Sequence, residues 1–221
     1  MILHITNGDY FHRFFLDNYN AKYAGDAIVF REAMIQGDTE KEVLSNAFIS
    51  TRAKALNVDE KFYKENAKDL LDFCDSHKNY SQLCLWFGRD SFCQLNLLTL
   101  LALLEKIHYQ GKISLYIIDD ESGAILEENI PVLLGNYQDI YEKILIQRIP
   151  APAISHFGVI CKQAIVLYYD YLSNDGALAK YVLENKEKDE TTLIKELLLK
   201  TKEYGLSDLN IIELIKRVLK A

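Results

Sequence analysis

The sequence has few of the residues that fix a chain covalently or break its helices. Three prolines and four cysteines occur in 221 residues, and no two cysteines have Cys-x-x-Cys or zinc-site spacing. The longest apolar run, Leu95 to Leu104, is too short and too interrupted to span a bilayer, and no basic segment with a cleavage site opens the chain. We therefore expect reduced structural thiols, no membrane partner and a cytoplasmic location.

Several catalytic signatures are also absent. The chain contains no P-loop, Gly-x-Ser-x-Gly or His-Glu-x-x-His pattern, and no Gly-x-Gly-x-x-Gly follows the first apolar run. These absences argue against a standard dinucleotide site and against the common hydrolase folds. The formal net charge of -7 makes nucleic acid an unexpected partner. Neither a cofactor nor a reaction follows from these patterns.

What the sequence does contain is an alternation of apolar runs and helical patterns. Four short, continuous apolar runs are typical of strands covered on both faces: Ile2–Ile5, Ala27–Phe30, Leu83–Phe87 and Ile113–Ile118. The helical patterns between them cover 11–19, 58–74 and 92–108. This order predicts an α/β fold with a mostly parallel, Rossmann-like sheet of about four strands flanked by helices.

The last third of the chain has a different pattern. After the acidic turn at 119–123, the stretch to Leu134 is irregular and is expected to be a lid loop, followed by a short helix at 137–146. Pro150 and Pro152 then mark a boundary. Helical patterns follow at 155–172, 177–185, 190–204 and 208–220, with Gly205 as a C-cap. We predict an α/β domain at 1–149 and a helical C-terminal domain at 150–221, which would carry any homo-oligomer contact.

Polar residues gather where the first three strands end. Ligands of open α/β sheets bind at the carboxyl edge, where such residues meet. Glycine allows close backbone approach, amide donors at a helix start favour phosphate, and the arginine fork suits carboxylate or phosphate. Amides in a leucine-rich helix need hydrogen-bond partners. The candidate ligand-binding residues are Asn7, Gly8, Asp9, Arg31, Glu32, Asp90, Gln94 and Asn96.

Each cluster also has a structural interpretation. The first can be a strand-to-helix turn capped by Asp9, and Arg31 can simply pair with Glu32 or Asp9. The third can be a buried network that caps a helix. Asp119 and Asp120 can hold Mg²⁺, but a solvated turn is the more common role of such residues, so no metal site is predicted.

Three segments resemble a bacterial family known as domain of unknown function 1835. They are Leu3–Asp9, Phe30–Met34 and Leu85–Leu98, which are similar to its His-x-x-Asn-Gly-Asp, Phe-Arg-Glu and Leu-Trp-Phe-x-x-Asp-x-Phe-x-Gln-Leu-Asn-Leu-Leu patterns. Residues 134–136 and the tail around Gly205 are similar to later parts of that family and its companion C-terminal domain. Asp38 stands where the family has proline, and residues 88–89 replace its acidic-His pair. The resemblance implies a shared fold and site, and no reaction.

Two hypotheses on function follow. The first is a bacterial protein that binds a small nucleotide-like or phosphorylated ligand at the carboxyl edge of the sheet, with or without catalysis. It requires Asp9, Arg31, Asp90 and Gln94 to face one open pocket. The second is a non-catalytic interaction or regulatory module whose polar clusters are structural. It predicts an exposed apolar patch on the helical tail.

Overall fold

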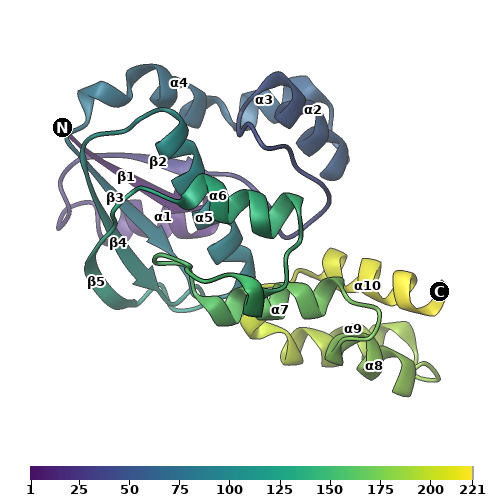
Figure 1. Ribbon diagram of the computed structural model, residues 1–221. Coiled ribbons are helices and arrows are strands. Elements are labelled where there is room, and N and C mark those ends of the chain that lie inside the picture. Colours follow the sequence, from purple (N-terminus) through teal and green to yellow (C-terminus); the bar gives the residue numbers. More distant parts are fainter. Residues whose placement is uncertain (221) are drawn as a thin grey trace.

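The centre of the computed structural model, which describes residues 1–220, is a five-stranded sheet in the order β2-β1-β3-β4-β5 (Figure 1). Its strands are β1 (Ile2–Asn7), β2 (Asp26–Phe30), β3 (Gln82–Phe87), β4 (Lys112–Ile118) and β5 (Ile125–Pro131). The first four are parallel, and β5 runs antiparallel to β4. The predicted fold, a mostly parallel Rossmann-like sheet followed by helices, is confirmed.

The prediction of a lid loop after β4 is wrong, because most of that stretch forms the strand β5. Its side chains are nearly all exposed or half-buried, so it lacks the apolar run that identified the other strands. A turn closed by the Gly123 amide, which donates to the Asp119 carbonyl at 2.8 Å, reverses the chain. Gly123 adopts a φ of +70°, which glycine tolerates. Charged side chains on this edge strand oppose pairing with another sheet.

The chain reverses its direction across the sheet between β1 and β3. The β1–β2 connection leads to one side of β1, and the β2–β3 connection returns to the other side. The helices after β1 and β3 are α1 (Gly8–Asn18) and α5 (Ser91–Lys106). They start at neighbouring strand ends and cover opposite faces: Phe11 and Phe15 of α1 pack against Trp86, whereas α5 packs against Leu83 and Leu85.

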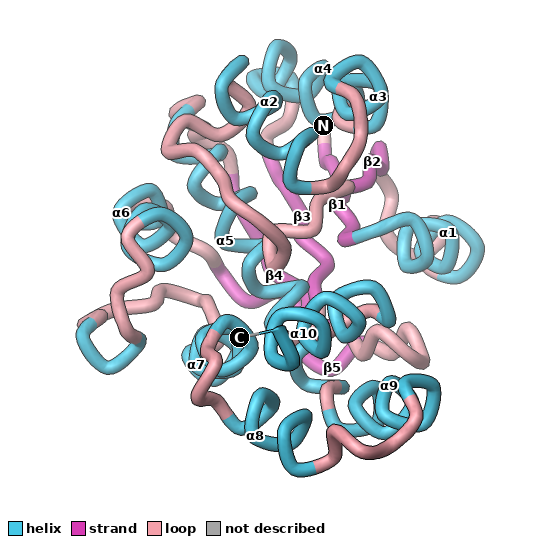
Figure 2. Tube along the Cα trace, turned by 90° about the vertical axis from the view of Figure 1, so that its right-hand side faces the viewer, coloured by secondary structure: helices cyan, strands magenta, loops and turns pink. Residues whose placement is uncertain are grey.

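The other helices surround this sheet (Figure 2). One group after β2 comprises α2 (Asn46–Ala55), α3 (Glu60–Asn66), α4 (Lys68–Ser76) and the 3-10 turn η1 (His77–Asn79). After β5 come α6 (Tyr137–Tyr141), the π-helical η2 (Glu142–Ile146) and η3 (Ala151–Ala153). The C-terminal group comprises α7 (Lys162–Leu172), α8 (Ala177–Glu184), α9 (Glu190–Lys200), η4 (Lys202–Tyr204) and α10 (Asp208–Lys220).

The C-terminal helices share one buried core with the sheet. Apolar residues of β1, β3 and α5 form one cluster with residues of α7, α8 and α10. The Ser91 hydroxyl at the start of α5 donates to the Ala164 carbonyl of α7 at 2.7 Å. The division near residue 149 stays a prediction. Among residues 1–220, no helix has both the length and the apolar character needed to cross a membrane.

Candidate functional site

A cleft of about 350 Å³ opens at the carboxyl ends of β1 and β3, where the chain reverses across the sheet. This is the position in which open α/β sheets bind ligands. Four segments form the walls: the start of α1, the start of α5, the end of β4, and the η4 turn. The residues around it are Asn7, Gly8, Asp9, Tyr10, Phe11, Asp90, Phe92, Cys93, Asp120, Lys202 and Gly205.

The first wall is the start of α1. Gly8 has a φ of +77°, and a Cβ built there would meet no atom within 4 Å, so the backbone is open to the cleft. Asn7 stands at the N-cap position but makes no side-chain capping bond, because its amide is used elsewhere. The first amides of α1 are therefore left without a side-chain cap, which suits an anionic ligand.

The second wall is the start of α5, where Asp90 is the N-cap. Its Oδ1 accepts a hydrogen bond from the Cys93 amide at 2.9 Å. Gly88 and Gly205 pack closely against Asp90, and a Cβ at either position would overlap its carboxylate. Gly205 belongs to the C-terminal turn and has a φ of +65°, a conformation that favours glycine. Two glycines from distant parts of the chain thus hold one carboxylate at the cleft.

Asp90, Cys93 and Asp120 form a close group in this wall. Their nearest polar atoms all lie within 4.8 Å of one another, and no other three His, Cys, Asp or Glu residues among residues 1–220 are close enough to hold a metal ion. Burial raises the pKa of the Cys93 thiol well above its ordinary value. Burial and the neighbouring Asp90 raise the pKa of Asp120 to about 7. Protonated groups of this kind favour a hydrogen-bonded network.

A chain of donors runs into this group. Asn96 Nδ2 donates to Asn7 Oδ1 at 2.9 Å, and Asn7 Nδ2 donates to Cys93 Sγ at 3.0 Å. The Cys93 thiol in turn donates to Asp120 Oδ2 at 3.3 Å. Buried amides thereby connect the ends of β1, β3 and β4.

Asn96 and Gln94 do not line the cleft, contrary to the expectation from the sequence. Asn96 is fully buried and also bonds the backbone of Glu32 and Met34, which follow β2. Gln94 donates to the Gly88 carbonyl at 2.6 Å and accepts from the Cys161 amide at 2.9 Å. Both amides therefore brace the strand ends from behind, and their polar atoms are already used.

Arg31 and Glu32 also lie outside the cleft, and they do not pair with each other. Arg31 Nε donates to Asp9 Oδ1 at 2.8 Å, and Asp9 itself faces the cleft. Glu32 turns inward, where Oε2 accepts hydrogen bonds from Arg52 Nε and Nη2 at 3.1 and 2.9 Å. The Tyr63 hydroxyl donates to its other oxygen. Glu32 therefore holds α2 and α3 to the end of β2.

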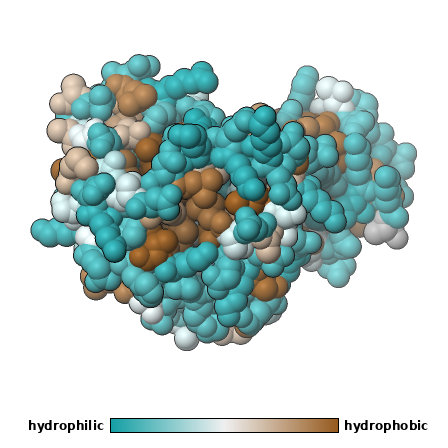
Figure 3. Space-filling model, turned by 90° about the horizontal axis from the view of Figure 1, so that it is seen from above, coloured by the Kyte–Doolittle hydropathy of each residue, from teal (hydrophilic) through white to brown (hydrophobic). Residues whose placement is uncertain are grey.

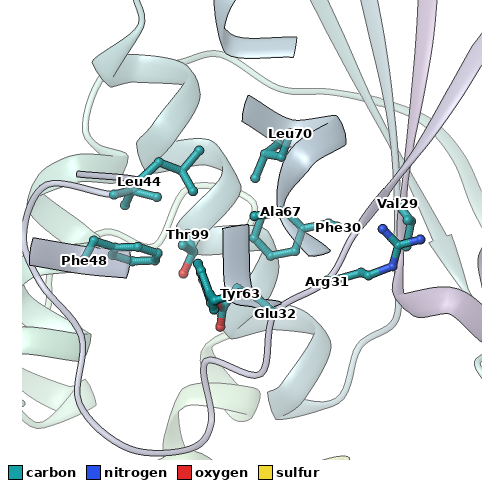
Figure 4. Close-up of a pocket in the computed structure, with 11 residues that line it drawn as sticks. Val29, Phe30, Arg31, Glu32, Leu44, Phe48, Tyr63, Ala67, Leu70 and Thr99 are labelled. Atoms are coloured by element: carbon teal, nitrogen blue, oxygen red, sulfur yellow. The ribbon is translucent and has the colours of Figure 1, made fainter. Parts of the chain in front are cut away.

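A second cavity next to Glu32 is too small to bind a ligand. It measures about 10 Å³, enough for no more than a single water molecule. Figure 4 shows the side chains of Leu44 and Phe48 on one side of it, with Arg31 extending away from them. The face that carries α2–α4 is largely polar, with apolar atoms gathered in a hollow near its middle (Figure 3).

Asp119, considered from the sequence as a metal ligand, instead closes the turn after β4. Its Oδ1 accepts hydrogen bonds from the Ser122 amide at 2.8 Å and the Ser122 hydroxyl at 2.6 Å. These bonds lower the pKa of Asp119. Asp119 therefore belongs to an exposed turn, which was the structural alternative to a metal ligand. Its neighbour Asp120 lines the cleft.

Several residues that form or support this site could not be predicted from the sequence. Arg52 is fully buried in α2, a helix that was not predicted. Lys202 and Gly205 line the cleft from more than 100 residues further along the chain than Asp90. The Gly205-Leu206-Ser207 turn was visible as a helix end, but nothing in its pattern indicated its neighbours.

Compared with family models, curated proteins and solved structures, the chain matches none of them.

Proposed function

We propose that the protein binds a small nucleotide-like or phosphorylated ligand in the cleft between the ends of β1 and β3. One observation carries this proposal: the uncapped start of α1 and the Lys202 side chain, whose ammonium pairs with the exposed Glu121, border the same cleft as Asp90. Backbone amides and an ammonium group attract phosphate. Carboxylates accept hydrogen bonds from sugar hydroxyls. The cleft therefore offers complementary groups for both halves of a sugar phosphate.

The size of the cleft favours a compact ligand. At about 350 Å³ it lies near the lower end of the range for small-molecule sites. A sugar phosphate or mononucleotide fits this volume better than a dinucleotide, which agrees with the absence of Gly-x-Gly-x-x-Gly after β1. Tyr10 and Phe92 supply apolar surface for a ring.

The resemblance to domain of unknown function 1835 supports the same location. The segment most similar to that family, Leu85–Leu98, forms β3 and the start of α5 and contributes Asp90 to the cleft. We also propose that the chain belongs to this bacterial family, is cytoplasmic, and binds its ligand with or without catalysis.

Calorimetric titration with AMP and ribose 5-phosphate tests the proposal, with adenosine and ribose as phosphate-free controls. We expect both phosphates to bind and both controls to bind at least tenfold more weakly. Lys202→Ala should weaken phosphate binding about tenfold, because a charged hydrogen bond contributes about 1.5 kcal/mol. Lys186→Ala, an exposed lysine between α8 and α9, should leave binding unchanged. Equal binding of ligands with and without phosphate would refute the proposal.

A second candidate is an interaction module built on the helical tail. Large apolar side chains are exposed on α8, α9 and α10, among them Leu183, Leu199 and Leu209. Exposed apolar side chains that gather into one patch mark contact surfaces, whereas single ones are ordinary. Sedimentation velocity of the full chain, compared with Leu199→Ser and Leu209→Ser, tests this candidate. A monomer at all concentrations would exclude a homo-oligomer formed through this tail.

A further inference from the structure

Asp90 and Asp120 approach each other over Gly88. A Cβ built on Gly88 would overlap the Oδ2 atoms of both carboxylates, so only glycine leaves room for the pair. Their closest oxygens lie within 4.8 Å of each other and of Cys93 Sγ. Two carboxylates this close and partly buried repel each other strongly when both are ionised, and one of them retains a proton.

The local structure determines which of the two keeps the proton. Asp90 Oδ1 accepts the Cys93 amide at the start of α5, where the helix dipole also favours a negative charge. Asp120 lies after the end of β4 and has no helix start to stabilise its ionised form. Burial is the main reason that the pKa of Asp120 rises to about 7, and the adjacent Asp90 adds to it.

We propose that Asp90 and Asp120 hold one proton between them at neutral pH, carried mainly by Asp120, and present it to the ligand as an acid. The role toward a ligand rests on the proposed function, whereas the shared proton is a property of the free protein. Both residues border the ligand cleft and also a neighbouring cleft of about 290 Å³. The pair is therefore reached by the ligand from one side and by solvent from the other.

The proton transfer involves only Asp120, an oxygen of the ligand and water. When Asp120 acts, its O–H bond breaks, a new O–H bond forms on a ligand oxygen, and the electron pair stays on the Asp120 carboxylate. Water in the neighbouring cleft returns the proton, so no oxidant or reductant is needed. The thiol of Cys93, fixed by the Asn7 amide, donates to Asp120 Oδ2 and holds the carboxyl group in place.

The surrounding charges do not cancel the effect of Asp90 on the pKa of Asp120. From α5 comes the neutral Cys93 thiol, and from the β4–β5 turn come the carboxylates of Asp119 and Glu121. Two cations border this side, Lys202 of η4 and Arg89 just after the end of β3. Both are exposed and pair with other carboxylates, Lys202 with Glu121 at 2.7 Å and Arg89 with Glu127. The charges nearest to Asp120 are thus negative and favour its protonated form.

Carbon-13 NMR of the full chain, labelled at the aspartate carboxyl carbons, tests the shared proton directly. We expect one aspartate to titrate with a midpoint near pH 7. That signal should be lost in Asp120→Asn and retained in Asp119→Asn, since Asp119 lies in the exposed turn. If every aspartate titrates below about pH 5, within the ordinary range for this side chain, the shared proton is refuted.

Calorimetric titration with AMP at several pH values tests the role toward the ligand. We expect wild-type affinity to fall about tenfold more than that of Asp120→Asn between pH 6 and pH 8, because asparagine keeps a neutral donor beside Asp90. The same pH dependence in both proteins would overturn the acid role. If AMP fails to bind at all, the acid role falls with the proposed function, and the NMR titration still decides whether the proton is shared.

Discussion

Asn96 illustrates how a polar residue in a leucine-rich helix can serve a site that it does not touch. Its amide bonds the Asn7 side chain and the backbone at Glu32 and Met34, so it ties together the ends of β1 and β2 from within α5. The sequence indicated correctly that such an amide needs partners. It did not distinguish a partner in a ligand from one in the protein, because that depends on which side of the strand ends the helix covers.

Arg52 is a comparable supporting residue, and we predict that its removal destabilises the fold. Its guanidinium is fully buried and donates to Glu32 and to the carbonyls of Ala33, Gln36 and Asp38. Arg52→Met leaves the Glu32 carboxylate buried without a counter-charge, at a cost of about 3–5 kcal/mol in the free energy of unfolding. Urea denaturation measures this change.

Arg13→Met is the matched control for Arg52, because Arg13 is an exposed arginine of α1. Its free energy of unfolding should stay within about 0.5 kcal/mol of the wild type. A loss below about 1 kcal/mol in Arg52→Met would contradict the supporting role that the structure gives to the buried ion pair.

The raised pKa of Asp120 predicts a pH-dependent effect on stability. The ordinary value of an aspartate is 3.8, whereas the pKa of Asp120 in the folded chain is about 7. As pH rises through this window the unfolded chain loses its proton first, so stability is lost with rising pH. Asp120→Asn should therefore be more stable than wild type at pH 8, by a few kcal/mol, since a tenfold change in acidity corresponds to about 1.4 kcal/mol.

Chemical denaturation at pH 4 and pH 8 measures this difference for Asp120→Asn. The gain should shrink towards pH 4, where the folded wild-type chain is protonated at this position and the unfolded chain, with an ordinary pKa of 3.8, is only partly ionised. A variant less stable than wild type at pH 8 would show that ionised Asp120 stabilises the fold, in conflict with its raised pKa.

Among the elements, those with the strongest apolar patterns could be predicted from the sequence, and those that depend on tertiary contacts could not. β1, β3, β4 and α5 are apolar segments that are mostly buried, and the edge strand β2 ends in the buried residues Val29 and Phe30. β5 is exposed and acidic, and it is a strand only because β4 offers a free edge. The predicted helix at 58–74 is divided into α3 and α4 at Ala67. α2 was missed because it buries a charged Arg52.

The turn after η4 contains Gly205, and we predict that replacing this glycine destabilises the fold. Gly205→Ala introduces a Cβ that overlaps Asp90 and places a side chain in the left-handed backbone region. The backbone strain alone costs about 1–2 kcal/mol, so we expect the melting temperature to fall by several degrees. Thermal denaturation measures it. Gly135→Ala is the control, since a Cβ at Gly135 would meet no atom within 4 Å; equal effects of both substitutions would contradict the packing of Gly205 on Asp90.

At the scale of the whole molecule, the C-terminal helices complete the cleft. Lys202 and Gly205 contribute to its lining, and α7 packs against α5 beneath it. The two prolines and the helical patterns after them predicted the boundary and the helical tail. The contact of this tail with the ends of β1 and β3 could not be predicted, because it depends on long-range packing. Periodicity identifies the buried side of a helix and gives no indication of what covers it.

Because the sheet and the C-terminal helices share one core, we predict that residues 1–149 and 150–220 unfold together. Trp86, the single tryptophan, is buried in the sheet and reports on residues 1–149, whereas far-ultraviolet circular dichroism is dominated by the helices. We expect fluorescence and circular dichroism to show one coincident transition in urea, because one apolar cluster spans both parts. Two separated transitions would indicate that the chain folds as independent domains.

An amide NMR titration of the full chain with AMP shows whether the cleft between β1 and β3 binds a phosphorylated ligand. We expect saturable shifts that are largest at the amides of Gly8, Asp9 and Tyr10, at the start of α1, with smaller shifts around Asp90. Saturable shifts confined to another surface, or no shifts at millimolar AMP and ribose 5-phosphate, would contradict binding in this cleft.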